Sequence, residues 1–263
     1  MIQRRNSAVE SLYLNRLESY LNGDITLPSS RLNKRPPGIH QSDLNDNSCI
    51  LKGYYANTLE ELPPMGVETI LKFATGRFWE RGVAFSGELE PKQLDRIWVT
   101  PDDYHPDIGI SEIKHTISSS LSDVRTDFPQ WVCQMKNQAY VFEEDHVNLI
   151  VMFVTGNTAS FAWDRGNMPK GTRYRGVAFI AWTFEFTEAE LEDNWKKMVE
   201  RRDLLESSIN DEIPIHRDIV LEQLPCRLKK GGKKSYWMCE KNSLGEPRCG
   251  YSDICYLKKE LIK

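Results

Sequence analysis

The chain has 263 residues, of which 40% are hydrophobic, enough for one large core or for a core with a small appendage. The formal net charge of −4 excludes a globally basic nucleic-acid-binding surface, although nucleases often confine positive charge to one cleft. No apolar run reaches membrane-spanning length, and the charged N-terminus lacks a signal-type apolar block. We therefore expect a soluble, cytoplasmic protein with no membrane partner.

Hydrophobic periodicity predicts an alternation of helices and strands. Leucines at near-helical spacing predict a helix over 7–22, and a polar, proline-containing stretch follows at 27–48. The pattern then predicts helices over 66–85 and 128–143, strands over 94–100, 108–115, 147–155 and 172–186, and a hairpin-type turn at 156–157. Thr187 and Glu190 form a capping box at the start of a long charged helix. This order of elements predicts a mixed α/β core.

The C-terminal residues differ from the rest because they are rich in Lys, Gly and Cys. We expect an N-terminal helix and polar loop over 1–45, a core over 46–222, and a small cysteine-rich, metal-binding appendage over 223–263. Six cysteines in a reducing compartment argue against a disulfide framework. The clustering of cysteines near the C-terminus favours a metal site instead; they are Cys226, Cys239, Cys249 and Cys255.

The stretch SEIKH, within the predicted strand 108–115, carries an acid and a lysine two residues apart. Alternate side chains of a strand point to opposite faces, so Glu112 and Lys114 project together. Ile113 points into the core, and His115 points with it, away from the two charges. One interpretation is a cross-strand ion pair on a solvated edge. The other is a metal-ligand acid beside a catalytic lysine.

Two further acids favour the catalytic interpretation. Glu80 lies in the helix that leads into the sheet, and Asp95 lies on the predicted strand before Glu112. Carboxylate oxygens suit Mg²⁺ or Mn²⁺, and the backbone carbonyl of Ile113 would complete the shell. Lys114 would then orient or deprotonate a metal-bound water and stabilise the charge that develops on a phosphate.

The order of helix acid, strand acid and E-x-K resembles the PD-(D/E)xK nuclease superfamily. Gln134 in the following helix resembles a motif of the RecB-like and lambda-exonuclease-like branch, in which a glutamine precedes an aromatic residue, here Tyr140. The resemblance implies a mixed sheet flanked by helices, and it implies metal-dependent hydrolysis of DNA phosphodiesters. On this interpretation Glu80, Asp95 and Glu112 hold the metal, and Gln134 with Tyr140 positions the strand or the lysine.

Cysteines at both ends of the core extend the resemblance. Cys49 lies in C-x-x-K-x-Y-Y. Near the C-terminus Cys239 ends a W-x-C pattern, and Cys249 and Cys255 bound a C-x-Y-x-x-x-C pattern. The set resembles CRISPR-associated RecB-type exonucleases, in which one N-terminal and three C-terminal cysteines bind a [4Fe–4S] cluster. The match covers about residues 42–256. A local Cys₄ zinc site with Cys226 in place of Cys49 stays open as an alternative. Cys133, inside the helix with Gln134, is expected in the core.

The resemblance implies an exonuclease on single-stranded DNA ends, acting in DNA processing, recombination or CRISPR spacer acquisition, an antiviral defence. Its partners would be DNA and other DNA-processing or CRISPR adaptation proteins. One alternative on the same fold is a site-specific or phage-type endonuclease. Another, from a different class, is a non-catalytic DNA-binding subunit stabilised by a zinc or iron–sulfur site.

Overall fold

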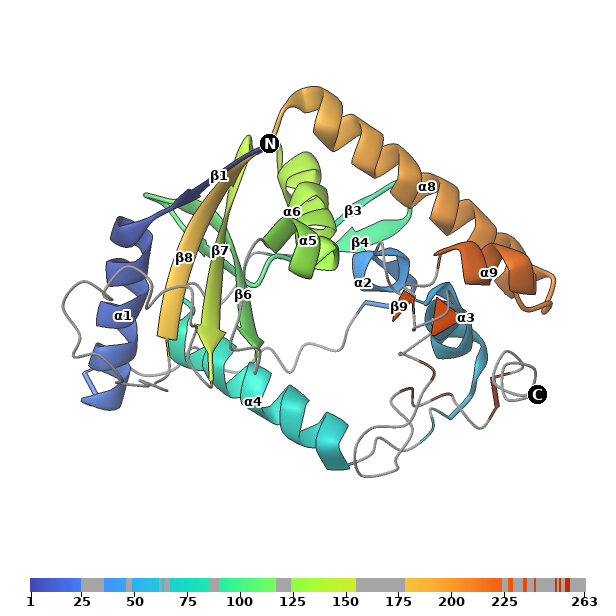
Figure 1. Ribbon diagram of the computed structural model, residues 1–263, viewed down its shortest axis with the longest axis horizontal. Helices are drawn as coiled ribbons and strands as arrows, with labels where there is room; N and C mark the ends of the chain where they lie inside the picture. Colours follow the sequence, from blue (N-terminus) through green and yellow to red (C-terminus); the bar gives the residue numbers. More distant parts are fainter. Residues whose placement is uncertain are drawn as a thin grey trace. The chain divides into compact units, whose positions relative to one another are not determined.

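The protein is an α/β fold in which mixed sheets are flanked by helices (Figure 1). The computed structural model describes residues 1–24, 36–45, 49–61, 63, 67–85, 90–116, 124–154, 178–223, 227–228, 234–235, 239, 249, 251 and 254–255. The chain divides into two compact units. The first unit contains Met1–Pro36, Ala74–Leu94 and Trp98–Trp195, and the second contains Pro37–Phe73, Asp95–Ile97 and Lys196–Lys263.

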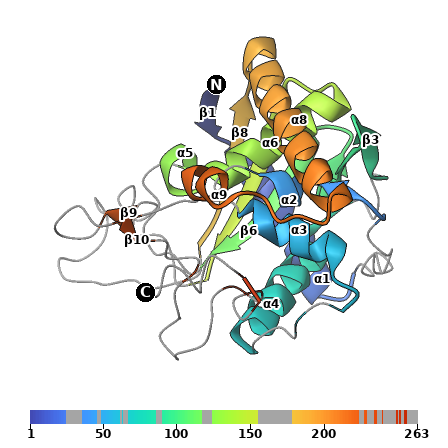
Figure 2. The ribbon, with the colours of Figure 1, turned by 90° about the vertical axis from the view of Figure 1, so that its right-hand side faces the viewer.

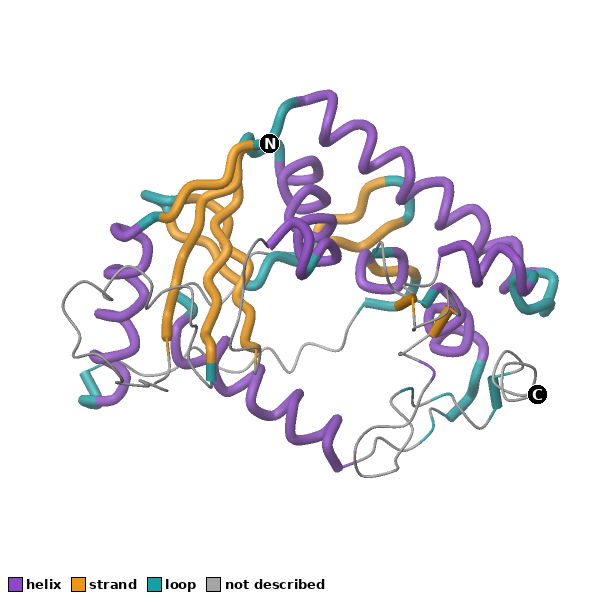
Figure 3. Tube along the Cα trace, in the orientation of Figure 1, coloured by secondary structure: helices purple, strands orange, loops and turns teal. Residues whose placement is uncertain are grey.

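The first unit is built on a five-stranded sheet in the order β1-β8-β7-β6-β5 (Figure 3). The strands are β1 (Ile2–Arg5), β5 (Asp103–His105), β6 (Gly109–Thr116), β7 (His146–Phe153) and β8 (Ala178–Glu185). β6 and β7 are parallel, whereas the other neighbouring pairs are antiparallel. A parallel pair needs a long crossover, and the helices between β6 and β7 provide it.

Helices cover both faces of this sheet. α1 (Ser7–Leu21) and α4 (Val67–Val83) lie on one face, and α5 (Val124–Asp127) and α6 (Pro129–Phe142) lie on the other (Figure 1). Val9, Tyr13 and Val83 pack on the α1 face, against Ile150 and Ala181 of the sheet. A larger apolar cluster, which includes Met135 and Leu149, fills the space under α6. Because both faces of the sheet are covered, the central strand β7 is buried at every residue after His146.

The predicted helix starts are confirmed by their caps. Asn6 Oδ1 accepts a hydrogen bond from Val9 N at 3.1 Å at the start of α1. α6 begins with Pro129. Proline has no backbone N–H, and this costs nothing in the first turn of a helix, where the N–H groups have no partner within the helix. At the start of α8 (Glu188–Asn210), Thr187 N donates to Glu190 Oε2 at 3.0 Å, and Glu190 N donates to Thr187 Oγ1 at 3.3 Å, completing the capping box.

The single strand predicted over 94–100 is wrong. The structure has two short strands there, β3 (Lys92–Leu94) and β4 (Ile97–Val99), which are neighbours in a small sheet. The turn between them consists of Asp95 and Arg96, with φ of 46° and 59°. Two successive residues at positive φ are typical of a tight hairpin turn. Aspartate tolerates this conformation, but neither residue is the glycine that marks such a turn in a sequence.

The second unit contains α2 (Gln41–Leu44), α3 (Ile50–Thr58), the later turns of α8, and α9 (Arg217–Gln223) (Figure 2). Gly53 explains the close packing of α3, since a Cβ there would lie 3.0 Å from the Leu205 side chain of α8 and 3.1 Å from Asp43 Cβ of α2. Two short strands, β9 (Arg227–Leu228) and β10 (Lys234–Ser235), pair antiparallel. The predicted turn at 156–157 lies outside the described residues. Within the described part of the chain, no helix is both long and apolar enough to cross a membrane.

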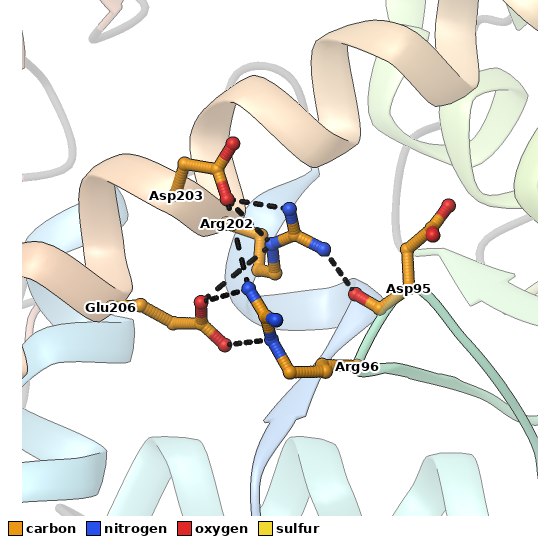
Figure 4. A network of polar contacts seen from close by, with 5 residues as sticks. All are labelled: Asp95, Arg96, Arg202, Asp203 and Glu206. Carbon is orange, nitrogen blue, oxygen red and sulfur yellow. Dashed lines mark hydrogen bonds and ion pairs between the residues drawn. The ribbon is translucent and has the colours of Figure 1, made fainter.

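Ion pairs fix the Asp95–Arg96 turn to α8 inside the second unit (Figure 4). The Arg96 guanidinium donates to both carboxylate oxygens of Glu206, at 2.9 and 2.7 Å. Buried Arg202 donates to the Asp95 carbonyl at 2.5 Å and is itself paired with Asp203. The turn backbone therefore has partners of its own on α8, which hold the positive φ values in place.

Candidate active site

β6 places Glu112 and Lys114 on the same face of the sheet, as strand alternation predicts. The Lys114 ammonium contacts Glu112 Oε1 directly. The Glu112 side chain is 0% exposed and that of Lys114 is 21% exposed. The ion pair therefore does not lie on a solvated edge, and that interpretation is wrong. On the opposite face Ile113 packs with the α1 cluster, and His115 lies against Gly76 of α4, confirming that both point away from the charges.

Asp102 is the acid that the structure brings to this pair. It lies just before β5, and its Oδ2 accepts a hydrogen bond from Ile113 N at 2.9 Å. The same oxygen is 3.7 Å from Lys114 Nζ. Asp102 thus occupies the place that the sequence pattern assigned to Asp95, which is an exposed turn residue of the second unit. The missed signal is the Pro101-Asp102 dipeptide that precedes the E-x-K stretch.

The helix residue in contact with Glu112 is Gln138 and not Gln134. Gln138 is fully buried on α6, and its Nε2 donates to Glu112 Oε2 at 2.5 Å. The same nitrogen is 3.5 Å from the Thr100 carbonyl. Gln134 lies one helical turn earlier and is partly exposed. The glutamine in contact with Glu112 thus lies on the predicted helix, four residues after Gln134, and the role predicted for Gln134 stays a prediction.

The charges of the site act strongly on one another. Burial raises the pKa of Glu112, and the neighbouring Asp102 raises it further, while Lys114 and the Gln138 hydrogen bond lower it. Burial alone would lower the pKa of Lys114, but Glu112, Asp102 and Glu80 together hold that pKa above its ordinary value. Glu80, on α4, therefore belongs to the electrostatic surroundings of the lysine. Its predicted role as a metal ligand stays a prediction.

The residues of the site suit a divalent cation in charge and chemistry. Three carboxylates, Glu80, Asp102 and Glu112, act on one lysine, so negative charge is in excess. Hard cations such as Mg²⁺ and Mn²⁺ prefer such oxygen ligands. Across the described residues, no group of three or more His, Cys, Asp or Glu side chains is drawn together in metal-binding geometry. The Lys114 ammonium instead contacts Glu112 and faces Asp102. The roles predicted for Asp95 and for the Ile113 carbonyl as metal ligands stay predictions.

Tyr140 follows Gln138 by two residues on α6, so its side chain points to a different side of the helix. Its ring stacks on Trp195 of α8, with centroids 5.3 Å apart and an angle of 24° between the planes. It also lines a shallow pocket of about 450 Å³ between α6 and β3, together with Lys92 and Glu143. Cys133 is buried on the same helix, as predicted for a core residue.

Cys49 lies within electrostatic range of two other predicted ligands, Cys239 and Cys249, in the second unit, but the described thiols are not drawn together in metal-binding geometry. Cys49 directly precedes α3, and burial raises the pKa of its thiol to about 12, with smaller increases from Cys249 and Cys239. Cys255 is buried, and Tyr251, four residues earlier, stacks on Tyr55 of α3 at 5.4 Å. The C-terminal segment thus contacts the helix that Cys49 begins. Cys226 lies outside the described residues.

Comparison of the chain with protein-family models, with curated proteins and with solved structures gave no match.

Proposed function

We propose that the protein is a metal-dependent deoxyribonuclease of the PD-(D/E)xK type. One observation supports this most strongly. Fully buried Glu112 contacts Lys114, and the Asp102 carboxylate accepts a hydrogen bond from the backbone N–H of Ile113, which lies between them. Burying an ion pair is costly, and apolar residues of similar volume stabilise a core at least as well. Perturbed charges held together in this way are typical of functional sites.

The residues have distinct roles in the proposed reaction. Asp102 and Glu112, with Glu80 nearby, would hold a divalent cation, which supplies charge neutralisation on the phosphate and an activated water when bound. Lys114 holds its proton at neutral pH, because three acids raise its pKa, and so it stabilises the negative charge of the attacked phosphate. Gln138 fixes the Glu112 carboxylate through its side-chain amide.

The substrate follows from the resemblance of the motifs. We propose single-stranded or end-containing DNA, processed in recombination or in CRISPR spacer acquisition. The cysteines near α3 are proposed to bind a [4Fe–4S] cluster, with structural zinc as the alternative. The four proposed ligands, Cys49, Cys239, Cys249 and Cys255, belong to the second unit, and Cys239 and Cys249 both raise the pKa of the Cys49 thiol.

The first experiment measures degradation of 5′-labelled linear single-stranded DNA by anaerobically purified protein with Mn²⁺ or with EDTA. We expect Mn²⁺-dependent products that are lost in Lys114→Ala. Lys136→Ala is the matched control, because Lys136 lies on α6 with its ammonium 6.0 Å from the Phe186 ring centroid. This variant should keep wild-type activity.

Circular single-stranded DNA in the same assay separates the two modes of cleavage. An exonuclease leaves the circle intact, and an endonuclease opens it. If wild-type protein binds DNA but cleaves neither substrate with Mn²⁺, the nuclease proposal is contradicted and the non-catalytic binding subunit replaces it.

A further inference from the structure

The acids of the proposed site have a hydrogen-bonded counterpart on the opposite face of the sheet. Asp103 and Ser111 are paired residues of β5 and β6. Each one directly adjoins a site acid, because Asp102 precedes Asp103 and Glu112 follows Ser111. Neighbouring strand residues point to opposite faces. Asp102 and Glu112 therefore face Lys114, while Asp103 and Ser111 face α1.

A tyrosine of α1 meets this pair. The Tyr13 hydroxyl donates to Asp103 Oδ2 at 2.7 Å, and both side chains are fully buried. The backbone N–H of Phe85, after α4, donates to the same oxygen at 2.9 Å. The Ser111 hydroxyl lies near the same phenol but forms no hydrogen bond with the described residues. The Tyr13 hydroxyl is thus hydrogen-bonded to β5 through Asp103, beside the residue of β6 that adjoins Glu112.

Such a connection limits how the two acids move relative to each other. A buried carboxylate is stable only while its hydrogen bonds are made, so Asp103 holds β5 against α1. Asp102 directly precedes Asp103 in the chain, and its carboxylate accepts a hydrogen bond from the backbone N–H of Ile113 on β6. Loss of the Tyr13 hydroxyl removes one donor to Asp103 Oδ2, while the donor N–H of Phe85 and the apolar packing of the ring stay in place.

We infer that Tyr13, hydrogen-bonded to Asp103 and beside Ser111, is a positioning residue that sets the spacing of the Asp102 and Glu112 carboxylates from behind the sheet. The inference rests on the proposed function, since the spacing matters for holding a divalent cation. Residues that support metal ligands without touching the metal typically change metal affinity by about 10–100-fold when they are altered.

The test compares Tyr13→Phe with wild-type protein in two titrations with Mn²⁺. One follows DNA cleavage, and the other follows the rise in melting temperature of the full chain without DNA. We expect about a tenfold higher Mn²⁺ requirement in both titrations. Ser111→Ala should shift the requirement in the same direction, and it provides a second variant if Tyr13→Phe folds poorly.

Val9→Ala is the matched control, because Val9 is buried in the same α1 cluster as Tyr13 and has no polar side-chain atom. It should lower the melting temperature and leave the Mn²⁺ requirement unchanged. An unchanged requirement in both Tyr13→Phe and Ser111→Ala, or an equal shift in Val9→Ala, overturns the inference. Failure of the proposed function is distinguishable, because wild-type protein itself would then show neither cleavage nor a Mn²⁺-dependent melting temperature.

Discussion

The pKa of Glu112 depends on burial and on the neighbouring Asp102, Lys114 and Gln138. The Glu112 carboxylate has no exposure to water and contacts the Lys114 ammonium. Replacing Lys114 with methionine keeps much of the side-chain volume but leaves the acid without its cation. We expect Lys114→Met to lower the free energy of unfolding by about 3 kcal/mol, at the lower end for a broken buried pair because Lys114 is partly exposed.

This loss should depend on pH in a defined direction. Burial raises the folded-state pKa of Glu112 above its unfolded value, so stability associated with this group is present at low pH and is lost as pH rises through the folded pKa. Loss of Lys114 raises that pKa further. Urea unfolding of Lys114→Met and wild type should therefore differ more at about pH 8.5 than at about pH 5.5. Equal differences at both pH values would contradict the stabilisation of ionised Glu112 by Lys114.

Gln138 and Gln134 provide a direct comparison on one helix. Gln138→Met removes the amide that binds Glu112, so the carboxylate loses a hydrogen bond that lowers its pKa. We expect about tenfold lower activity. We also expect the acid limb of the pH–activity profile to move to higher pH, because more alkaline solution is needed to ionise Glu112. The measurement is a profile of initial cleavage rates from acid to alkaline pH.

Gln134→Met is the control for this comparison, since it makes the same change of side chain one turn earlier on α6. It should leave both the rate and the profile close to those of wild type. The opposite result, with Gln134 essential and Gln138 replaceable, would restore the assignment made from the sequence pattern.

At the scale of elements, β4 lies between the two candidate metal-ligand acids: Asp95 is in the β3–β4 turn, and Asp102 follows β4. Asp95 lies at positive φ in its turn, where asparagine is also favoured, and Arg202 binds its backbone carbonyl. Asp95→Asn should therefore change the free energy of unfolding by no more than about 0.5 kcal/mol and leave cleavage intact. Asp102→Asn should abolish Mn²⁺-dependent cleavage, because it removes a carboxylate that faces Lys114. Loss of cleavage in Asp95→Asn would return the metal-ligand role to Asp95.

Long periodic segments made most of the fold predictable. The helices over Ser7–Leu21 and Pro129–Phe142 and the buried strand His146–Phe153 carry apolar residues at consistent spacing, and local caps confirm two of their starts. The hairpin was missed because its turn uses Asp95 and Arg96. Partners on α8 hold these residues at positive φ, and such tertiary contacts leave no local pattern.

The candidate site was predictable where it depends on one strand. Glu112 and Lys114 share a face because alternation is a local property. Asp102 and Gln138 reach them from other elements. The pairing of Asp103 with Ser111 brings Asp102 to the site, and the rotation of α6 about its axis brings Gln138. Neither contact can be read from the spacing of the residues along the chain. Several acids and glutamines lie at similar sequence distances, so spacing alone does not select among them.

At the scale of the whole molecule, the second unit is assembled from distant segments: Pro37–Phe73, Asp95–Ile97 and Lys196–Lys263. Bringing such segments together requires long loops to close, which opposes folding through chain entropy. Cys49 belongs to the first of these segments, and Cys239, Cys249 and Cys255 belong to the last. A metal cluster bound by them would connect both ends of the unit, so metal binding and folding of this unit would be coupled.

Cysteine substitutions test this coupling. Cys49→Ser should lower the iron and sulfide content of anaerobically purified protein and increase trypsin cleavage in the second unit, because a ligand between its first and last segments is lost. Cys133→Ser is the control, since Cys133 is equally a buried cysteine but lies on α6 of the first unit; it should keep the metal. Zinc in place of iron, retained in Cys49→Ser and lost in Cys226→Ser, would instead support the local Cys₄ site. Retention of iron in Cys49→Ser would make Cys49 a packing residue, since its buried thiol, with a pKa near 12, is neutral unless a metal binds it.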